Sequence, residues 1–176
     1  MKKVFSIFAA AMVCALMLVS CAKSAFQNEL DAINSALDSK DFATVIDNAN
    51  KIINGTEQAA AADLVCAGTA LNSVVVSKQE AGEIEAQEAI DLLNKVSAAF
   101  EAAKSKSDYN AALATSKAAG VDVEALATAI PATVASFQAT IDAATQQAEA
   151  TEGEATEGEA TEGAAEGEAT EAVEAE

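Results

Sequence analysis

The sequence predicts an all-α fold of about six helices arranged as antiparallel hairpins. Alanine, the strongest helix former, provides 45 of the 176 residues, whereas proline occurs once. Apolar residues in the central part recur every three or four positions, which is the period of a helix with one buried face. Between residues 22 and 148 only 30 residues are Leu, Ile, Val, Phe or Tyr, which is enough for one small core.

The composition divides the chain into three parts. Residues 1–20 have the pattern of an export signal, residues 21–148 form the helical domain, and residues 149–176 form a tail. The tail contains 11 Glu and no Lys, and it repeats the pentad Ala-Thr-Glu-Gly-Glu. High charge with almost no large apolar residue cannot offset the loss of chain entropy on folding. We therefore expect the tail to be disordered.

The first two helices form a predicted αα-hairpin. Ser24 to Gln27 has the form of a capping box before a helix over about 25–38, whose apolar residues are Phe26, Leu30, Ile33 and Leu37. Residues 38–41 form a turn in which Asp41 is the expected N-cap. The second helix ends at Asn54-Gly55, and its apolar positions are Phe42, Val45, Ile46, Ala49, Ile52 and Ile53.

Four further helices follow. Thr56 is the expected cap of a third helix, which carries Leu64, Val65, Gly68, Leu71 and Val75. Ser77 to Glu80 has the form of a second capping box and predicts a long helix from there to Lys104, with these residues facing inward: Ile84, Ala89, Ile90, Leu93, Val96 and Phe100. Asp108 would cap a fifth helix that ends at Gly120. A sixth helix starts at Asp122 and is interrupted at Pro131.

One pattern occurs twice in these helices. Asp41-Phe42 and Asp108-Tyr109 are both followed, after two residues, by an apolar pair, and they lie 67 residues apart. This spacing is close to two tetratricopeptide periods of about 34 residues. The hairpins therefore resemble tetratricopeptide units in architecture, although the Trp of that pattern is missing. A plain helical bundle is the alternative.

The first 21 residues carry the clearest functional signal. Lys2 and Lys3 precede the apolar run Val4 to Val19, which as a helix would span about 24 Å, less than the hydrocarbon core of a bilayer. A signal peptide fits this run better than a transmembrane anchor. The tetrapeptide Leu18-Val19-Ser20-Cys21 resembles the lipobox of bacterial lipoproteins.

This resemblance implies a processing pathway and a location. It implies cleavage between Ser20 and Cys21 and attachment of diacylglycerol and a further acyl chain, such as palmitate, to Cys21. Ala22, rather than Asp, follows the cysteine, which resembles the signal for the outer membrane in families that sort lipoproteins between two membranes. Two or three acyl chains are enough to anchor a protein stably in a membrane. The chain is thus expected in the bacterial cell envelope, facing either the periplasm or the outside.

The residue inventory argues against an enzyme. His and Arg are absent, which removes the usual general base near neutral pH and the bidentate ligand of phosphate. No phosphate-binding loop, dinucleotide fingerprint, nucleophile elbow or Cys-x-x-Cys motif occurs. The net charge of −18 opposes binding to nucleic acid. We expect no catalytic residue, no cofactor and no metal site.

Three features of the helical domain are candidate sites. The acidic run Glu80, Glu83, Glu85, Glu88 and Asp91 has pairs spaced for two metal ions, but no His accompanies them, so a solvated face is favoured. Cys66 lies in an apolar stretch and is interpreted as a small buried residue. Tyr109 and the four Phe residues of the helical domain are interpreted as core.

These observations lead to one main functional hypothesis and two alternatives. The main hypothesis is a non-enzymatic, lipid-anchored envelope protein whose hairpins bind a protein or peptide, or serve as a structural module. The first alternative is a surface-displayed antigenic or structural lipoprotein in which the acidic repeat is the functional part. The second is a binder of a small apolar ligand between alanine-rich helices.

Overall fold

The computed structural model of the protein describes residues 24–154, with side chains described to residue 148. This part of the chain contains six helices and no strand, so the all-α prediction and the number of helices are confirmed. The described residues fall into two units, the first ending at Ile141 and the second beginning at Asp142. The second unit is helical as far as Glu154.

The first hairpin forms where the sequence predicts it. Helices α2 (Gln27–Ser39) and α3 (Phe42–Asn54) pack against each other across a short turn. Lys40 closes α2 in the left-handed conformation, with φ of 57°. The carboxylate of Asp41 then accepts a hydrogen bond from the Thr44 N–H at 3.2 Å, so the predicted N-cap is confirmed.

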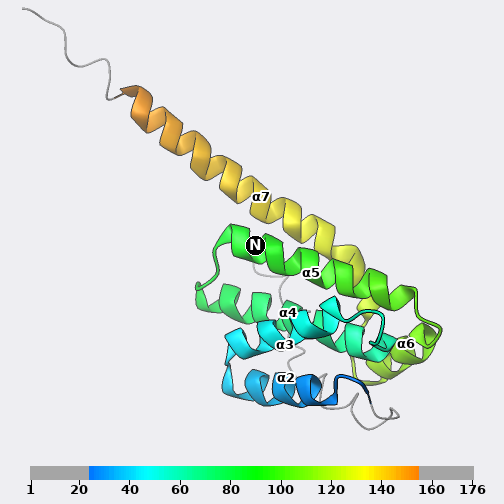
Figure 1. Ribbon diagram of the computed structural model, residues 1–176. Coiled ribbons are helices and arrows are strands. Elements are labelled where there is room, and N and C mark those ends of the chain that lie inside the picture. The colour runs from blue at the N-terminus through cyan, green and yellow to red at the C-terminus, as the bar shows by residue number, and fades with distance from the viewer. Residues whose placement is uncertain (1–23, 155–176) are drawn as a thin grey trace, which may run out of the picture. The chain divides into compact units, whose positions relative to one another are not determined.

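Helix α4 (Ala61–Ala81) is the centre of the first unit (Figure 1). It contacts α2, α3, α5 and α6, and 13 of its 21 residues are buried. A helix covered on several sides needs apolar residues around most of its circumference. The run Val74-Val75-Val76, which favours strands in isolation, therefore lies in a helix whose tertiary contacts outweigh local propensity.

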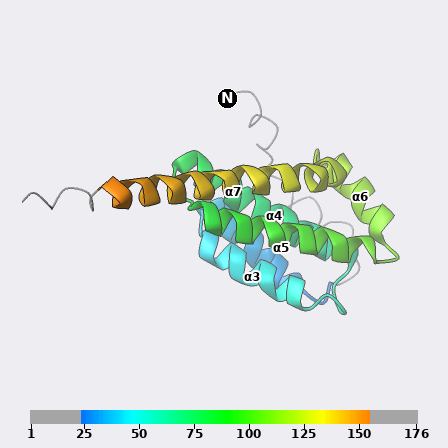
Figure 2. The same ribbon diagram turned by 90° about the horizontal axis from the view of Figure 1, so that it is seen from above.

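Helix α5 (Ala86–Lys104) packs along α4, and Phe100 is 1% exposed at their contact. Helix α6 (Tyr109–Ala118) contacts α4, and α7 (Val123–Glu154) follows after a short turn. Figure 2 shows the α4–α5 pair and α3 from above. Leu126 and Ile130, on the first turns of α7, are buried in the core of the first unit.

Two predicted helix starts are wrong. Thr56 does not cap α4, because residues 55–58 form a turn and the helix begins only at Ala61. Ser77 to Glu80 does not begin a helix, because these residues form the last turns of α4. Gly82, with φ of 71°, ends α4 in the left-handed conformation, and α5 starts four residues later. The predicted inward positions from Ala89 onward are buried, as expected.

Three further details of the prediction are corrected. Ser24 Oγ accepts from the Phe26 N–H at 2.9 Å, so the predicted reciprocal capping box with Gln27 does not form. Helix α7 continues through Pro131, which lies at an exposed position, so the predicted interruption does not occur. The same helix also includes residues 149–154, which were predicted to belong to the disordered tail. The rest of that tail lies outside the described residues.

Candidate functional site

The predicted lipidation site lies outside the described residues. Ser20 and Cys21 precede Ser24, the first residue whose structure is described. Ser24 is already tied to the start of α2 by its hydrogen bond from Phe26. Only three peptide units therefore separate the α-carbons of Cys21 and Ser24, which limits their distance to about 11 Å.

Three segments meet at one end of the first unit, which we call the proximal end. They are the start of α2 (residues 24–27), the α3–α4 turn (residues 55–60) and the α5–α6 turn (residues 105–108), which lie together on the right in Figure 1. A Cβ atom built on Gly55 would lie 2.3 Å from Cζ of Phe26, so the phenyl ring rests directly on the backbone of that turn. A larger residue at this position would require the ring to move.

The other two segments are joined by polar contacts. The ammonium group of Lys106 donates a hydrogen bond to the Thr56 carbonyl oxygen. The Ala61 N–H donates to both oxygens of the Asp108 carboxylate, at 3.3 and 3.2 Å. Asp108 was predicted to cap the helix that follows it, but its side chain instead caps α4, 47 residues earlier.

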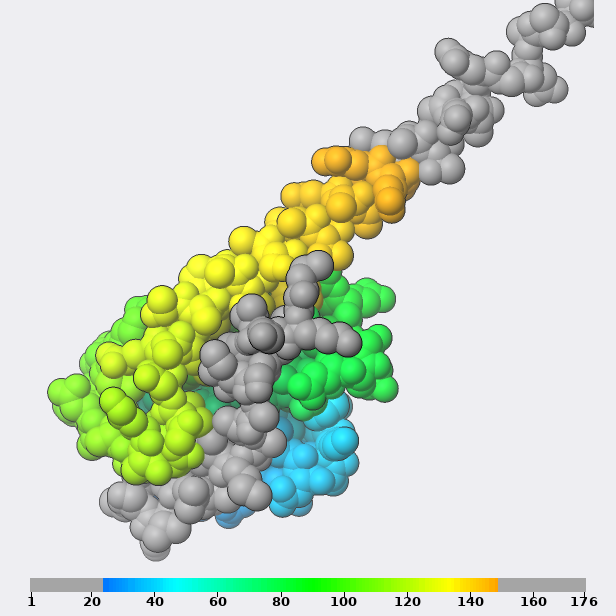
Figure 3. All heavy atoms as spheres, turned by 180° about the vertical axis from the view of Figure 1, so that it is seen from behind, coloured from blue at the N-terminus to red at the C-terminus, as the bar shows by residue number. Residues whose placement is uncertain are grey.

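The opposite end, which we call the distal end, consists of the α2–α3 turn (residues 38–41) and the α4–α5 turn with its flanking residues (78–91). These segments lie together on the left in Figure 1, and Figure 3 shows the same end from behind. Lys78 on α4 pairs with Glu88 on α5, and this ion pair closes the distal end. Across 21 residues of α4, the two ends are about 30 Å apart.

The acidic run lies at this distal end. Glu80, Glu83, Glu85 and Asp91 are exposed, and Glu88 is held by Lys78. Within residues 24–154 no group of three or more His, Cys, Asp or Glu is placed to hold a metal ion. The arrangement is that of the solvated acidic face favoured by the sequence.

Cys66 and Tyr109 lie in the core or against it. Cys66 is 3% exposed on α4, as its apolar surroundings predict. Tyr109 is partly buried against the core at the start of α6, and burial raises the pKa of its phenol above the usual 10.0. Tyr109 therefore packs against the core, as the sequence predicts.

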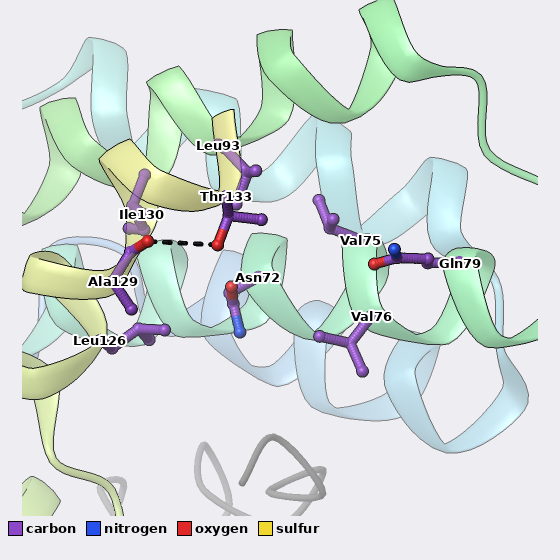
Figure 4. Close-up of a pocket in the computed structure, with 9 residues that line it drawn as sticks. All are labelled: Asn72, Val75, Val76, Gln79, Leu93, Leu126, Ala129, Ile130 and Thr133. Carbon is purple, nitrogen blue, oxygen red and sulfur yellow. Dashed lines mark hydrogen bonds between the residues drawn. The ribbon is translucent and has the colours of Figure 1, made fainter. Parts of the chain in front are cut away.

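A small hollow lies between α4, α5 and α7 (Figure 4). Its volume is about 30 Å³, and its lining consists of Asn72, Val75, Val76, Gln79, Leu93, Leu126, Ala129, Ile130 and Thr133. Asn72 is only 8% exposed, and its side chain lies at the edge of this hollow. The Thr133 hydroxyl is already engaged, because it donates to the Ala129 carbonyl.

The size and polarity of this hollow suit one or two water molecules beside Asn72. Pockets for small organic ligands have volumes of about 300–1,000 Å³. The hollow therefore gives no support to the apolar-ligand alternative. Asn72 was not singled out from the sequence, although a lone amide in the apolar stretch from Leu64 to Val76 is a usable signal.

Comparison of the chain with protein-family models, with curated proteins and with solved structures finds no match in any of the three. Among the described helices, none is long and apolar enough by itself to cross a membrane. Only α6 and α7 taken together, with a sharp bend between them, pass a test of length and composition.

Proposed function

We propose that the chain is a non-enzymatic lipoprotein of the bacterial cell envelope, anchored through acyl chains on Cys21. The observation that carries this proposal is the sequence of the first 21 residues. Two lysines, a short apolar run and the tetrapeptide Leu18-Val19-Ser20-Cys21 occur in the order that lipoprotein processing requires. The start of the helical body so soon after Cys21 agrees with it, because cleavage there would remove none of the core.

The helical body is proposed to bind a protein or peptide, or to serve as a structural module of the envelope. Its core is filled by aliphatic side chains, Phe100 and alanine, and its buried polar residues are few: Asn48, Asp63, Thr69, Asn72 and Ser116. The chain contains no His, and Cys66 is buried. This inventory supports a scaffold rather than a catalyst.

The anchor is tested by metabolic labelling with an alkyne analogue of palmitate and by the intact mass of the membrane-bound protein. We expect the wild type to be labelled and to begin at Cys21. The Cys21→Ser variant should be unlabelled and should retain residues 1–20. The matched control is Cys14→Ser, which removes a thiol from the apolar run and leaves the lipobox intact, so it should be labelled like the wild type. Label on Cys21→Ser, or none on the wild type, would overturn the proposal.

A partner is tested by chemical crosslinking in intact cells, followed by purification of the detergent-solubilised lipoprotein. The binding module predicts one crosslinked protein recovered in stoichiometric amount. Recovery of the lipoprotein alone would contradict binding and leave the structural role.

The acidic repeat supports a second candidate, a surface-displayed lipoprotein. Eleven Glu without Lys in residues 149–176 form a strongly hydrated segment suited to exposure outside the cell. Protease treatment of intact cells should then remove the repeat while a periplasmic marker protein stays whole. A repeat that survives this treatment would place the protein inside the envelope and exclude display.

A further inference from the structure

We infer that the proximal end is a membrane-contact surface that rests on the headgroups of the bilayer holding the acyl chains. This inference rests on the proposed lipid anchor and adds to it the orientation of the helical body. The occupant is the bilayer surface itself, and the argument uses chain length, the position of Ser24 and the charge at the two ends.

Chain length decides which end can lie at the membrane. At most about 11 Å of chain joins Cys21 to Ser24. Ser24 and Phe26 belong to the proximal end, because Phe26 rests on Gly55 in the α3–α4 turn. The distal end is about 30 Å away along α4, which is more than this linker can span. An orientation with the distal end on the bilayer is therefore excluded for an acylated protein.

The charges at the two ends favour the orientation with the proximal end on the bilayer over one in which the helices lie parallel to the bilayer surface. The proximal end, at residues 24–27, 55–60 and 105–108, contains one Lys and two acidic residues, for a net charge of −1. Residues 38–41 and 78–91 at the distal end contain seven acidic residues and two Lys, for a net charge of −5. Anionic lipids repel the distal end. A distance of about 30 Å is several times the Debye length of about 8 Å. At that distance from the bilayer, salt screens most of this repulsion.

The exposed side chains of the proximal end match headgroups rather than hydrocarbon. Glu57, Gln58, Ser105 and Ser107 are exposed and polar, whereas the large apolar Phe26 is half-buried against the α3–α4 turn. Polar groups at this level can exchange hydrogen bonds with phosphates and water, but they would be costly inside the bilayer.

The orientation is tested with the full-length mature lipoprotein in vesicles of phosphatidylethanolamine and phosphatidylglycerol. A Cys66→Ala background leaves one reactive thiol, because the sulfur of Cys21 is occupied by the lipid. Single cysteines replace Gln58 or Ser107 at the proximal end and Glu83 at the distal end; all three positions are exposed turn residues. Each cysteine carries a fluorophore, and the quencher is a nitroxide on the lipid headgroup.

We expect quenching at positions 58 and 107 to exceed that at position 83 by more than about twofold, because α4 holds the two ends about 30 Å apart. Equal quenching at the three positions, or more at position 83, would overturn the inference while leaving the anchor intact. Intact mass measured on the same samples reports acylation separately. Protein without acyl chains would overturn the proposed anchor, and the inference with it.

Discussion

Gly68 lies on α4 in contact with α5. A Cβ atom built at this position would lie 2.6 Å from Cε1 of Phe100, 3.0 Å from its Cδ1 and 3.3 Å from Cβ of Ala99. Alanine would raise the helix propensity by about 1 kcal/mol, but the phenyl ring is 1% exposed and has no free space to move into. We expect Gly68→Ala to lower the free energy of unfolding by about 1–2 kcal/mol in urea titrations.

The matched comparison for this prediction is the same substitution in a Phe100→Leu background, where the ring that opposes the new methyl group is gone. There Gly68→Ala should cost less than it does in the wild type, which gives a positive coupling between the two sites. A stabilising Gly68→Ala variant would show that the close contact does not constrain this position.

Asp41 is the residue whose local hydrogen bonds predict a pH dependence. Thr44 donates to its carboxylate from the hydroxyl at 2.6 Å and from the backbone N–H at 3.2 Å, and these bonds lower the pKa of Asp41 below 3.8. A carboxyl whose pKa is lower in the folded state stabilises the fold above its unfolded pKa. This contribution is lost as the pH falls through the folded pKa.

We therefore expect Asp41→Ala to be less stable than the wild type at neutral pH, by an amount that shrinks as the pH falls below 3.8. Urea titrations at several pH values measure this difference, and the side-chain carboxyl resonance of Asp41 reports its pKa directly. Asp47→Ala, at an exposed position in the same helix, is the matched control for the loss of one carboxylate. A deficit for Asp41→Ala that persists at the lowest pH would contradict the charge-dependent cap.

At the scale of single helices, the prediction from sequence succeeded where the stabilising contacts are local. The turn at Lys40 and the cap at Asp41 depend on residues within four positions of each other, and both the second helix and the hairpin follow from them. Thr56 and Ser77 have equally good local patterns, but neither is used as a cap. The start of α4 is instead fixed by Asp63 within the helix and by Asp108 from a distant turn.

Asp108 links two helices that are distant in sequence. The Ala61 N–H lies in the first turn of α4, where backbone N–H groups have no partner within the helix. Asp108→Ala should therefore lower the free energy of unfolding by about 0.5–2 kcal/mol, as expected for the loss of an N-cap. Hydrogen exchange should accelerate at Ala61 and in the α3–α4 turn.

The control for this substitution is Ser107→Ala, an exposed neighbour in the same turn. It should leave both the stability and the exchange rates unchanged. If Asp108→Ala accelerated exchange only within α6, the side chain would be capping its own helix and the link to α4 would be refuted.

For the whole molecule, the all-α class and the core positions could be predicted because alanine content and apolar spacing are properties of the sequence alone. The contacts at the proximal end could not be predicted, because they depend on which turns meet after folding. No sequence pattern indicates that the residues making these contacts come together. They are Phe26, Gly55, Lys106 and Asp108. Asn72 was missed for a similar reason, since its burial follows from the packing of α7 over α4.

The net charge of −18 predicts that salt stabilises the whole molecule. Like charges repel more strongly in the compact state, and raising the salt concentration from about 0.01 M to about 1 M shortens the Debye length from about 30 Å to about 3 Å. We expect Tm to rise with sodium chloride over this range. Deleting residues 149–176, which removes 11 negative charges, should reduce the rise. A Tm that stays constant or falls would show that self-repulsion does not limit stability.

The burial of α4 on several sides has a consequence for how the molecule opens. A neighbouring helix that detached would expose part of α4 to water, so partial unfolding that reaches α4 itself requires the loss of several helix contacts. Its amide protons should be the slowest to exchange, at rates set by global unfolding. Most of its contacts are with α3 and α5, the helices on either side of it in sequence. Contacts between helices that follow one another in sequence favour rapid folding, so α3, α4 and α5 should assemble before α6 and the first turns of α7 pack against them.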